Sequence, residues 1–356
     1  MNASFRFASL TLLLAVSSPL LCAQAQPAPA PRAGLAPLEK RIQSIRKHFP
    51  GEMAVYMKNL FTGEELALDA DTVYETFSVI KIPIMAEILR QAEAGKFSLD
   101  DRITLKPADR RLPSGVLYTL DPGASLTVRD LLTLMIILSD NEATDLLGDK
   151  AGRPNVTAFM RELGLPKTTI EFSDLDWDRH WLGSLDPSYR NAPGDKTIDF
   201  PFEKYTDAQV RAAFGKTIWD AGIYFGHSTP REIARLLELI QQRQLVSKSA
   251  SEFMLATLAK QQVNNRFPKY LLDVPVAHKT GDGQPFLAND AGILTVKGQP
   301  IVLVVFTAHH RGETEPLHDA IAQVAAAVAS HYGAQLLPGA PLPATPPRIA
   351  PSRGSR

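Results

Sequence analysis

Apolar residues recur along the chain with two periods, one typical of helices and one typical of strands. Residues 38–49 carry apolar positions three and four apart among charged ones, which predicts an amphipathic helix. Residues 53–60 alternate apolar and polar positions, and residues 65–68 return after a Thr62-Gly63 turn, which predicts a hairpin. The same patterns predict later elements, with strands at 274–279, 291–296 and 301–306 and a helix at 316–332.

The middle of the chain has a mainly helical pattern. Residues 131–138 are apolar on every side, which predicts a buried helix that stops at their end. Thr229 and Glu232 have the spacing of a capping box, so another helix should begin there. Residues 171–228 show little periodicity but hold all three tryptophans, which indicates a long, irregular but ordered loop.

The order of these elements predicts an α/β fold of the mixed α+β kind. We expect an antiparallel sheet of about five strands, flanked by the two terminal helices. A helical subdomain, roughly residues 84–260, would be inserted between the second and third strands. One folded domain would then span residues 38–335.

The two ends of the chain differ in composition from the rest. Arg6, an apolar stretch at 7–21 and an Ala-x-Ala site have the pattern of a secretory signal peptide at residues 1–25. Residues 26–37 form a Pro/Ala-rich linker, and the Pro-rich tail at 336–356 should be disordered. We therefore expect an exported protein, secreted or periplasmic, with no membrane span after cleavage.

Composition narrows the classes of partner. The 356 residues include 38 basic and 38 acidic side chains, so charge does not indicate a nucleic acid partner, and 45% hydrophobic residues is typical of a globular protein. The single cysteine, Cys22, lies in the predicted signal peptide, which excludes disulfides and thiol catalysis in the mature chain. His309 and His310 have no third ligand at suitable spacing, so we expect no metal. We expect a monomer that acts on a small molecule without a cofactor.

Ser78 and Lys81 form a Ser-x-x-Lys pair at the start of an apolar helix. Residues three apart share a helix face, so the lysine could take the proton of the serine hydroxyl if burial lowers its pKa. About one such spacing is expected by chance in a chain of this length. A serine beside a solvated lysine is therefore the simpler interpretation of this pair by itself.

Two rarer triplets change that balance. Ser139-Asp140-Asn141 stands where the predicted buried helix ends. Lys279-Thr280-Gly281 stands at the end of a predicted strand, where a glycine lets another backbone approach closely. Each triplet is expected far less than once by chance. We therefore predict that the three motifs form one site.

These motifs, in this order, resemble those of the class A β-lactamases, within the wider superfamily of penicillin-recognising serine acyltransferases. The resemblance extends to residues 126–132, 228–230 and 289–292 and covers roughly residues 35–333. It implies a β-lactamase-like fold for the domain predicted above. That domain would accordingly be the catalytic domain.

The resemblance also implies a role for each motif residue. Ser78 would attack the lactam carbonyl with Lys81 as a candidate base, and Ser139 would relay a proton to the departing nitrogen. Asn141 would bind the side-chain amide of the substrate, and Asp140 would be structural. Lys279, Thr280 and Gly281 would bind the end of the substrate that carries the carboxylate. The backbone N–H groups of Ser78 and Asp282 would form the oxyanion hole.

The chain departs from the family at the residue that clears the acyl group. Class A enzymes use a glutamate in a Glu-Pro-x-x-Asn loop, and here the nearest match is Asp186-Pro187 with Asn191, one residue longer. Asp186 is therefore the candidate base. Its rivals are other carboxylates of the same region: Glu171, Asp174, Asp176 and Asp178. An insertion of about 25 residues at 199–228 could form a lid.

Three functions remain open from the sequence. The first is an exported serine β-lactamase that hydrolyses a cyclic amide through an acyl-Ser78 intermediate. The second keeps the site but acts on a peptidoglycan peptide, as a D-alanyl-D-alanine carboxypeptidase or another ester or amide hydrolase. The third is a penicillin-binding protein that is acylated without efficient turnover.

Overall fold

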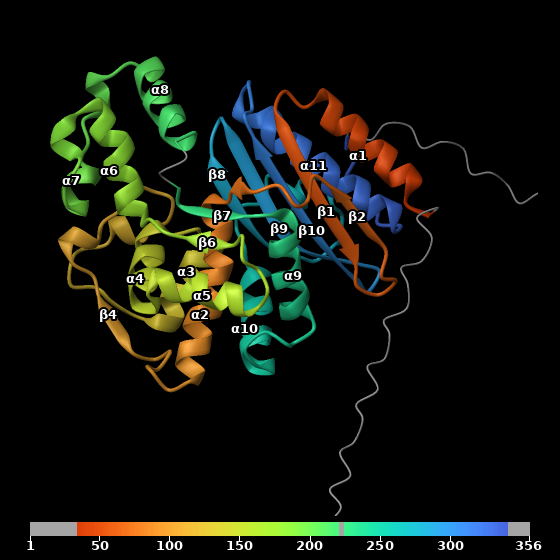
Figure 1. Ribbon diagram of the computed structural model, residues 1–356, viewed down its shortest axis with the longest axis horizontal. Coiled ribbons are helices and arrows are strands. Elements are labelled where there is room, and N and C mark those ends of the chain that lie inside the picture. The colour runs from red at the N-terminus through yellow and green to blue at the C-terminus, as the bar shows by residue number, and fades with distance from the viewer. Residues whose placement is uncertain (1–33, 221–223, 341–356) are drawn as a thin grey trace, which may run out of the picture.

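A five-stranded antiparallel sheet forms the frame of the molecule (Figure 1). This computed structural model describes residues 34–220 and 224–340, so the predicted signal peptide, most of the linker and most of the tail lie outside the described residues. The strand order is β2-β1-β10-β9-β8. The strands are β1 (Glu52–Asn59), β2 (Glu65–Leu68), β8 (Val276–Gly283), β9 (Leu287–Val296) and β10 (Gln299–Ala308). The predicted sheet is confirmed.

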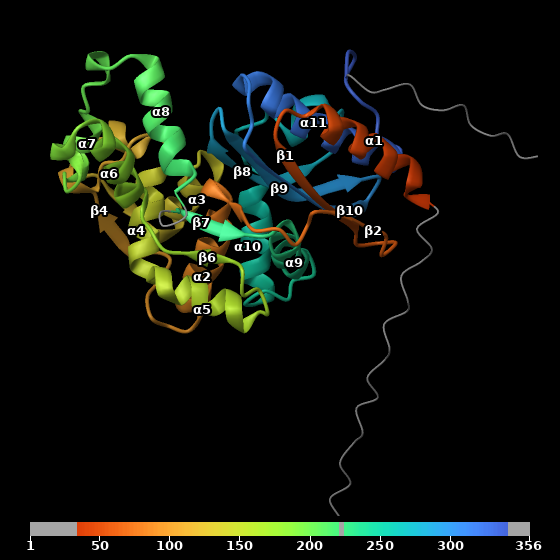
Figure 2. The same ribbon diagram turned by 45° about the horizontal axis from the view of Figure 1, so that its top comes forward.

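The terminal helices α1 (Ala36–His48) and α11 (Thr314–His331) cover one face of this sheet (Figures 1 and 2). Alternate residues of a strand point to opposite faces, so Val55 of β1 packs in the core beneath these two helices. Its neighbour Tyr56 joins the second core, which lies between the sheet and the helical part of the chain. The sheet is thus buried on both faces, as its nearly continuous apolar strands require.

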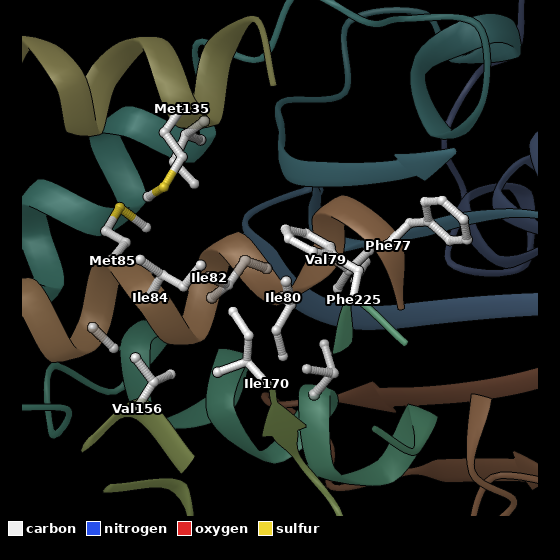
Figure 3. Packing of buried hydrophobic residues seen from close by; sticks show 14 of the residues in the cluster. Phe77, Val79, Ile80, Ile82, Ile84, Met85, Met135, Val156, Ile170 and Phe225 are labelled. Atoms are coloured by element: carbon white, nitrogen blue, oxygen red, sulfur yellow. The ribbon is translucent and has the colours of Figure 1, made fainter. Parts of the chain in front are cut away.

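The helical part follows the first hairpin in sequence, as predicted. It contains α2 (Lys81–Glu93), α3 (Val128–Ile137), α4 (Asn141–Ala151), α5 (Arg153–Glu162), α6 (Asp174–Leu185), α7 (Gly194–Ile198), α8 (Asp207–Ile218), α9 (Pro230–Gln241) and α10 (Lys248–Leu258). Helix α2 is its centre: Ile82, Ile84 and Met85 are fully buried and pack among neighbours that include Met135 and Val156 (Figure 3). Burial of one such side chain contributes about 1.5–3 kcal/mol, so this helix is held firmly in place.

Short strands complete the architecture. They are β3 (Tyr74–Glu75), β6 (Thr169–Ile170) and β7 (Gly226–Ser228), which form a sheet in the order β3-β7-β6, and the pair β4 (Arg102–Thr104) and β5 (Ser125–Thr127). The predicted helix start at Thr229 is confirmed, because its side chain accepts the N–H of Glu232. The reciprocal half of the capping box is not formed. The Glu232 carboxylate instead accepts hydrogen bonds from the Lys167 backbone and the Thr168 hydroxyl, at 3.0 and 2.7 Å.

Residues 171–228 are more regular than predicted. They contain helices α6, α7 and α8 rather than one irregular loop. Trp177 and Trp181, one turn apart on α6, both pack edge-on against Phe214 of α8, with centroid separations of 5.0 and 5.5 Å. The apolar stripe of these helices is aromatic and short, so its period was hard to recognise. In the described residues, no helix is long and apolar enough to cross a membrane.

Candidate active site

Ser78 lies in a short 3₁₀ helix, η2 (Phe77–Ile80), that runs directly into α2. It is half-buried and lines a cavity of about 570 Å³. Phe77, just before it, has a φ of 45°, a left-handed conformation that is strained for an aromatic residue. The buried helix behind Ser78 holds this strained turn in place.

Strand β8 lies directly against this turn, because Gly281 has no side chain. A Cβ atom there would lie 2.3 Å from the Thr76 carbonyl oxygen and 3.3 Å from the Ser78 nitrogen. Asn289 of β9 also ties the turn to the sheet, since its Nδ2 donates to the carbonyls of Glu75 and Thr76 at 2.9 and 3.2 Å. The Ser78 and Lys279 motifs, about two hundred residues apart, are thereby brought together.

Lys81 is completely buried at the start of α2. Its Nζ donates to the Ser139 carbonyl at 2.7 Å, to the Ser139 hydroxyl at 3.1 Å and to Asn141 Oδ1 at 2.8 Å. Burial lowers the pKa of Lys81, although the carboxylates of Asp174 and Asp140 oppose this effect. A lysine whose pKa is lowered by burial can act as a base near neutral pH.

Lys279 is equally buried and donates to the same hydroxyl, Ser139 Oγ, at 3.0 Å, and to the Thr280 carbonyl at 2.8 Å. Burial, and then the charge of Lys81, hold the pKa of Lys279 well below its usual value. Ser139 has a φ of 56°, a second strained residue at the site. Because a hydroxyl oxygen accepts two hydrogen bonds, the two lysines saturate Ser139 Oγ as an acceptor and leave its proton free to be donated.

Asp140 and Asn141 make different contacts in the structure. The Asp140 carboxylate caps α4 by accepting Ala143 N–H at 2.9 Å, and it also accepts Val116 N–H at 2.6 Å. The Oδ1 atom of Asn141 accepts a hydrogen bond from Lys81 Nζ, and its Nδ2 donates to the Leu112 carbonyl at 3.0 Å. One N–H of the Asn141 amide therefore remains for a ligand.

Asp282 and Thr280 lie on β8 beside the turn that carries Ser78. The buried Arg266 pairs with Asp282 and also donates to the Asn289 carbonyl at 2.8 Å. Burial raises the pKa of Asp282, but Arg266 and His318 outweigh it and the pKa is lowered. The Thr280 hydroxyl is buried and makes no hydrogen bond with the described residues. Arg266 was missed in the sequence, because no local pattern marks it as buried.

Asp186 does not join this cavity. Its carboxylate caps the short helix η5 (Pro187–Tyr189) by accepting Ser188 N–H at 2.9 Å, which lowers the pKa of Asp186. It is absent from the residues that line the cavity around Ser78. The geometry therefore goes against Asp186 as the base, because a general base must reach the water that it activates.

Two of the rival carboxylates lie on the cavity wall instead. Asp174 and Asp178 of α6 line the same cavity as Ser78. Asp174 is held by Asp145, whose Oδ1 accepts its backbone N–H at 2.9 Å. Burial raises the pKa of Asp174 to about 7, against the opposing charge of Lys81. The signal for this pair was present in the sequence, because Asp174 and Asp178 have the same four-residue spacing as the glutamate and asparagine of the family loop.

The rest of the cavity wall is strongly aromatic. Its aromatic residues are Phe77, Trp177, Trp181, Phe202, Phe214 and Phe225. Within the described ranges there is no group of three or more His, Cys, Asp or Glu side chains that could hold a metal ion. The site therefore has a nucleophile, two buried lysines, a bridging hydroxyl and a pair of acids. That set suits acyl transfer through a covalent serine intermediate.

Comparison with known proteins identifies the family and the fold. Residues 37–332 match the Beta-lactamase enzyme family. The chain is 23% identical to β-lactamase VEB-1 of Pseudomonas aeruginosa over 312 residues, which cover 83% of this chain and 90% of that protein. The crystal structure of a β-lactamase from Sphaerobacter thermophilus superposes with a TM-score of 0.67 at 24% identity, covering 84% of this chain and 98% of the other. The structure of PBP-A gives a TM-score of 0.65 at 23% identity, covering 84% and 96%.

The protein belongs to the Beta-lactamase enzyme family. Its fold is that of the class A β-lactamases, as the resemblance implied. The family match covers nearly all of the described residues.

Proposed function

We propose that this protein is a serine β-lactamase that opens the lactam amide through an acyl-Ser78 intermediate. The observation that carries the proposal is the hydroxyl of Ser139, bonded to both buried lysines at 3.1 and 3.0 Å beside the cavity that Ser78 lines. This arrangement offers a base, a proton relay and a cation within one water-poor site.

In the acylation step, Lys81 accepts the Ser78 hydroxyl proton as the serine oxygen bonds to the lactam carbonyl carbon. The backbone N–H groups of Ser78 and Asp282 stabilise the developing oxyanion. The lactam C–N bond then breaks, and Ser139 donates its proton to the nitrogen while Lys81 passes the proton that it took from Ser78 to Ser139 Oγ, 3.1 Å away. Lys279 and the Thr280 hydroxyl bind the substrate carboxylate, with Arg266 behind them adding positive charge.

In the deacylation step, Asp174 accepts a proton from a water molecule that attacks the acyl carbon. Support comes from its place on the cavity wall and from its pKa of about 7, which suits a base at neutral pH. A carboxylate on the wall of this cavity favours turnover over a stalled acyl-enzyme. It therefore favours the β-lactamase over the penicillin-binding alternative.

We also propose that the protein is exported, on the basis of the signal pattern at residues 1–25. Mass measurement of the protein recovered from the periplasm or culture medium should show cleavage near residue 25. Retention of the full chain in the cytoplasm would contradict this part of the proposal.

The first test is intact-protein mass spectrometry after mixing with benzylpenicillin, sampled from seconds to an hour. We expect an adduct that forms and then disappears while penicilloate accumulates, and no adduct in Ser78→Ala. A persistent adduct would instead identify a penicillin-binding protein. Absence of any adduct, combined with release of D-alanine from a peptide ending in D-alanyl-D-alanine, would identify a carboxypeptidase.

A further inference from the structure

A second acid lies one helical turn from Asp174. Asp178 is four residues further along α6, and residues so spaced share one face of a helix, with Cβ atoms about 5–6 Å apart. Both residues line the cavity with Ser78, and Asp178 is only 8% exposed. The Oδ2 atom of each is buried and has no hydrogen-bond partner. The cavity wall therefore contains two unsatisfied carboxyl oxygens close together.

In the described part of the chain, no lysine or arginine forms an ion pair with either acid. Lys81, from α2, donates to Ser139 and Asn141. Arg111 and Arg153 both pair with Asp145 of α4, which largely offsets their charges; Asp145 raises the pKa of both acids, and Arg111 lowers it.

On the α8 side, the packing against α6 is aromatic, through Phe214. Two carboxylates in such surroundings cannot both ionise at a modest cost.

We propose that Asp174 and Asp178 share one proton, and that this proton resides on Asp178 and is required for deacylation. The inference rests on the proposed function. Asp178 Oδ1 accepts the Trp181 indole N–H at 3.3 Å, which leaves Oδ2 to carry the proton. Burial and then the charge of Asp174 raise the pKa of Asp178 well above its usual value, whereas Lys81 opposes the rise at Asp174. Asp174 is thus the ionised member.

The shared proton gives Asp178 a role that an ionised carboxylate could not fill. The asparagine that ends the loop motif of the family offers an N–H donor, and a protonated Asp178 offers an O–H donor to the attacking water. The water gives one proton to Asp174 as its oxygen bonds to the acyl carbon. When the bond from that carbon to Ser78 Oγ breaks, the proton returns from Asp174 to Ser78. The pair therefore ends the step with the single proton that it held at the start.

The test is the decay rate of the benzylpenicillin acyl-enzyme between pH 5 and pH 9, followed by intact mass. In the native protein the rate should fall about tenfold per pH unit once the shared proton is lost, since one proton is required. Asp178→Asn supplies a donor that does not titrate, so its rate should stay within about threefold between pH 7 and pH 9, where Asp174 remains the ionised base. Asp186→Asn, which changes an acid outside the cavity, should follow the native profile.

Two outcomes would overturn the proposal. An alkaline fall that persists in Asp178→Asn would belong to another group, such as Lys81 or Lys279. Loss of deacylation at every pH in a folded Asp178→Asn protein would show that Asp178 acts as a carboxylate.

A second measurement needs no substrate, so it separates this inference from the proposed function. Infrared difference spectra of the free proteins at pH 7 should show a protonated carboxyl group in the native protein that is lost in Asp178→Asn and kept in Asp186→Asn. A difference spectrum is needed because burial also raises the pKa of Glu75 and Glu142 to about 7. If no protonated carboxyl is lost in Asp178→Asn, the shared proton is disproved whether or not penicillin acylates Ser78.

Discussion

Asp145 on α4 binds the first turn of α6, where Asp174 lies. Its Oδ1 accepts the backbone N–H of Asp174 at 2.9 Å, and its Oδ2 accepts that of Leu175 at 3.1 Å. The same carboxylate, 1% exposed, pairs with Arg111 and Arg153. Asp145 lies four residues after Asn141, so the helix that carries the second motif also positions the proposed deacylating acid.

Replacing Asp145 should therefore affect both stability and turnover. Asp145→Ala leaves two arginines without their shared partner and should lower the free energy of unfolding by about 3–5 kcal/mol. The acyl-enzyme should also last longer, because α6 loses the contact that holds Asp174. Urea unfolding and the decay of the acyl adduct measure the two effects. Asp145→Asn keeps one side-chain oxygen and the shape of the side chain, so it should lower the free energy of unfolding by less. An Asp145→Ala protein with native stability would show that the contacts of Asp145 do not stabilise the fold.

Ser139→Ala should slow acylation rather than deacylation. It removes the hydroxyl that both lysines contact and the proton that the departing nitrogen requires, so we expect a loss of about 10²–10⁴-fold in the acylation rate. Stopped-flow measurement of single-turnover hydrolysis checks this. Ser114→Ala is a matched control, since Ser114 Oγ only donates to the Ser139 carbonyl, at 2.7 Å. Equal losses of acylation rate in the two variants would show that the Ser139 hydroxyl has no special role in proton transfer.

Gly281→Ala should separate β8 from the turn that carries Ser78. The added Cβ would meet the Thr76 carbonyl oxygen at 2.3 Å, so one of the two backbones must move. Overpacking of this kind costs about 1–3 kcal/mol, and acylation should slow with it because the Asp282 N–H shifts. Thermal unfolding and the acylation rate are the measurements. The control Thr280→Ser keeps the hydroxyl next to Gly281 and should retain the native Tm and acylation rate. Full activity in Gly281→Ala would show that the close contact between Gly281 and Thr76 is not needed.

Glu75 should make the protein less stable as pH rises. Burial raises its pKa from 4.5 to about 7, although it accepts N–H groups from Phe77 and Gly226. Between these pH values the folded protein holds a proton that the unfolded chain has lost, so stability decreases from about pH 4.5 to pH 7. Glu75→Gln removes this contribution and should narrow the difference in Tm between pH 5 and pH 7.5 by several degrees. An unchanged difference would show that Glu75 is ionised at pH 5.

The sequence by itself was sufficient for the strands of the main sheet, most of the helices and the three motifs, but not for the short strands β3 to β7. These features depend on residues close together in the chain: the continuous apolar run of β10, the capping threonine of α9, the helical spacing of Ser78 and Lys81. Local patterns of this kind predict the structure because each one shows which face of its segment is apolar and will be buried. The motif order then indicated the family.

Only the tertiary structure identified the acids that line the cavity with Ser78. Asp174 and Asp186 are both aspartates in a region with weak periodicity, and the chain gives each a plausible motif. The choice between them depends on a contact across 29 residues, from Asp145 to the N-terminus of α6. Arg266 is likewise assigned by its bonds to Asp282 and Asn289. Burial and charge at these positions are properties of packed neighbours distant in sequence, so no local pattern could predict them.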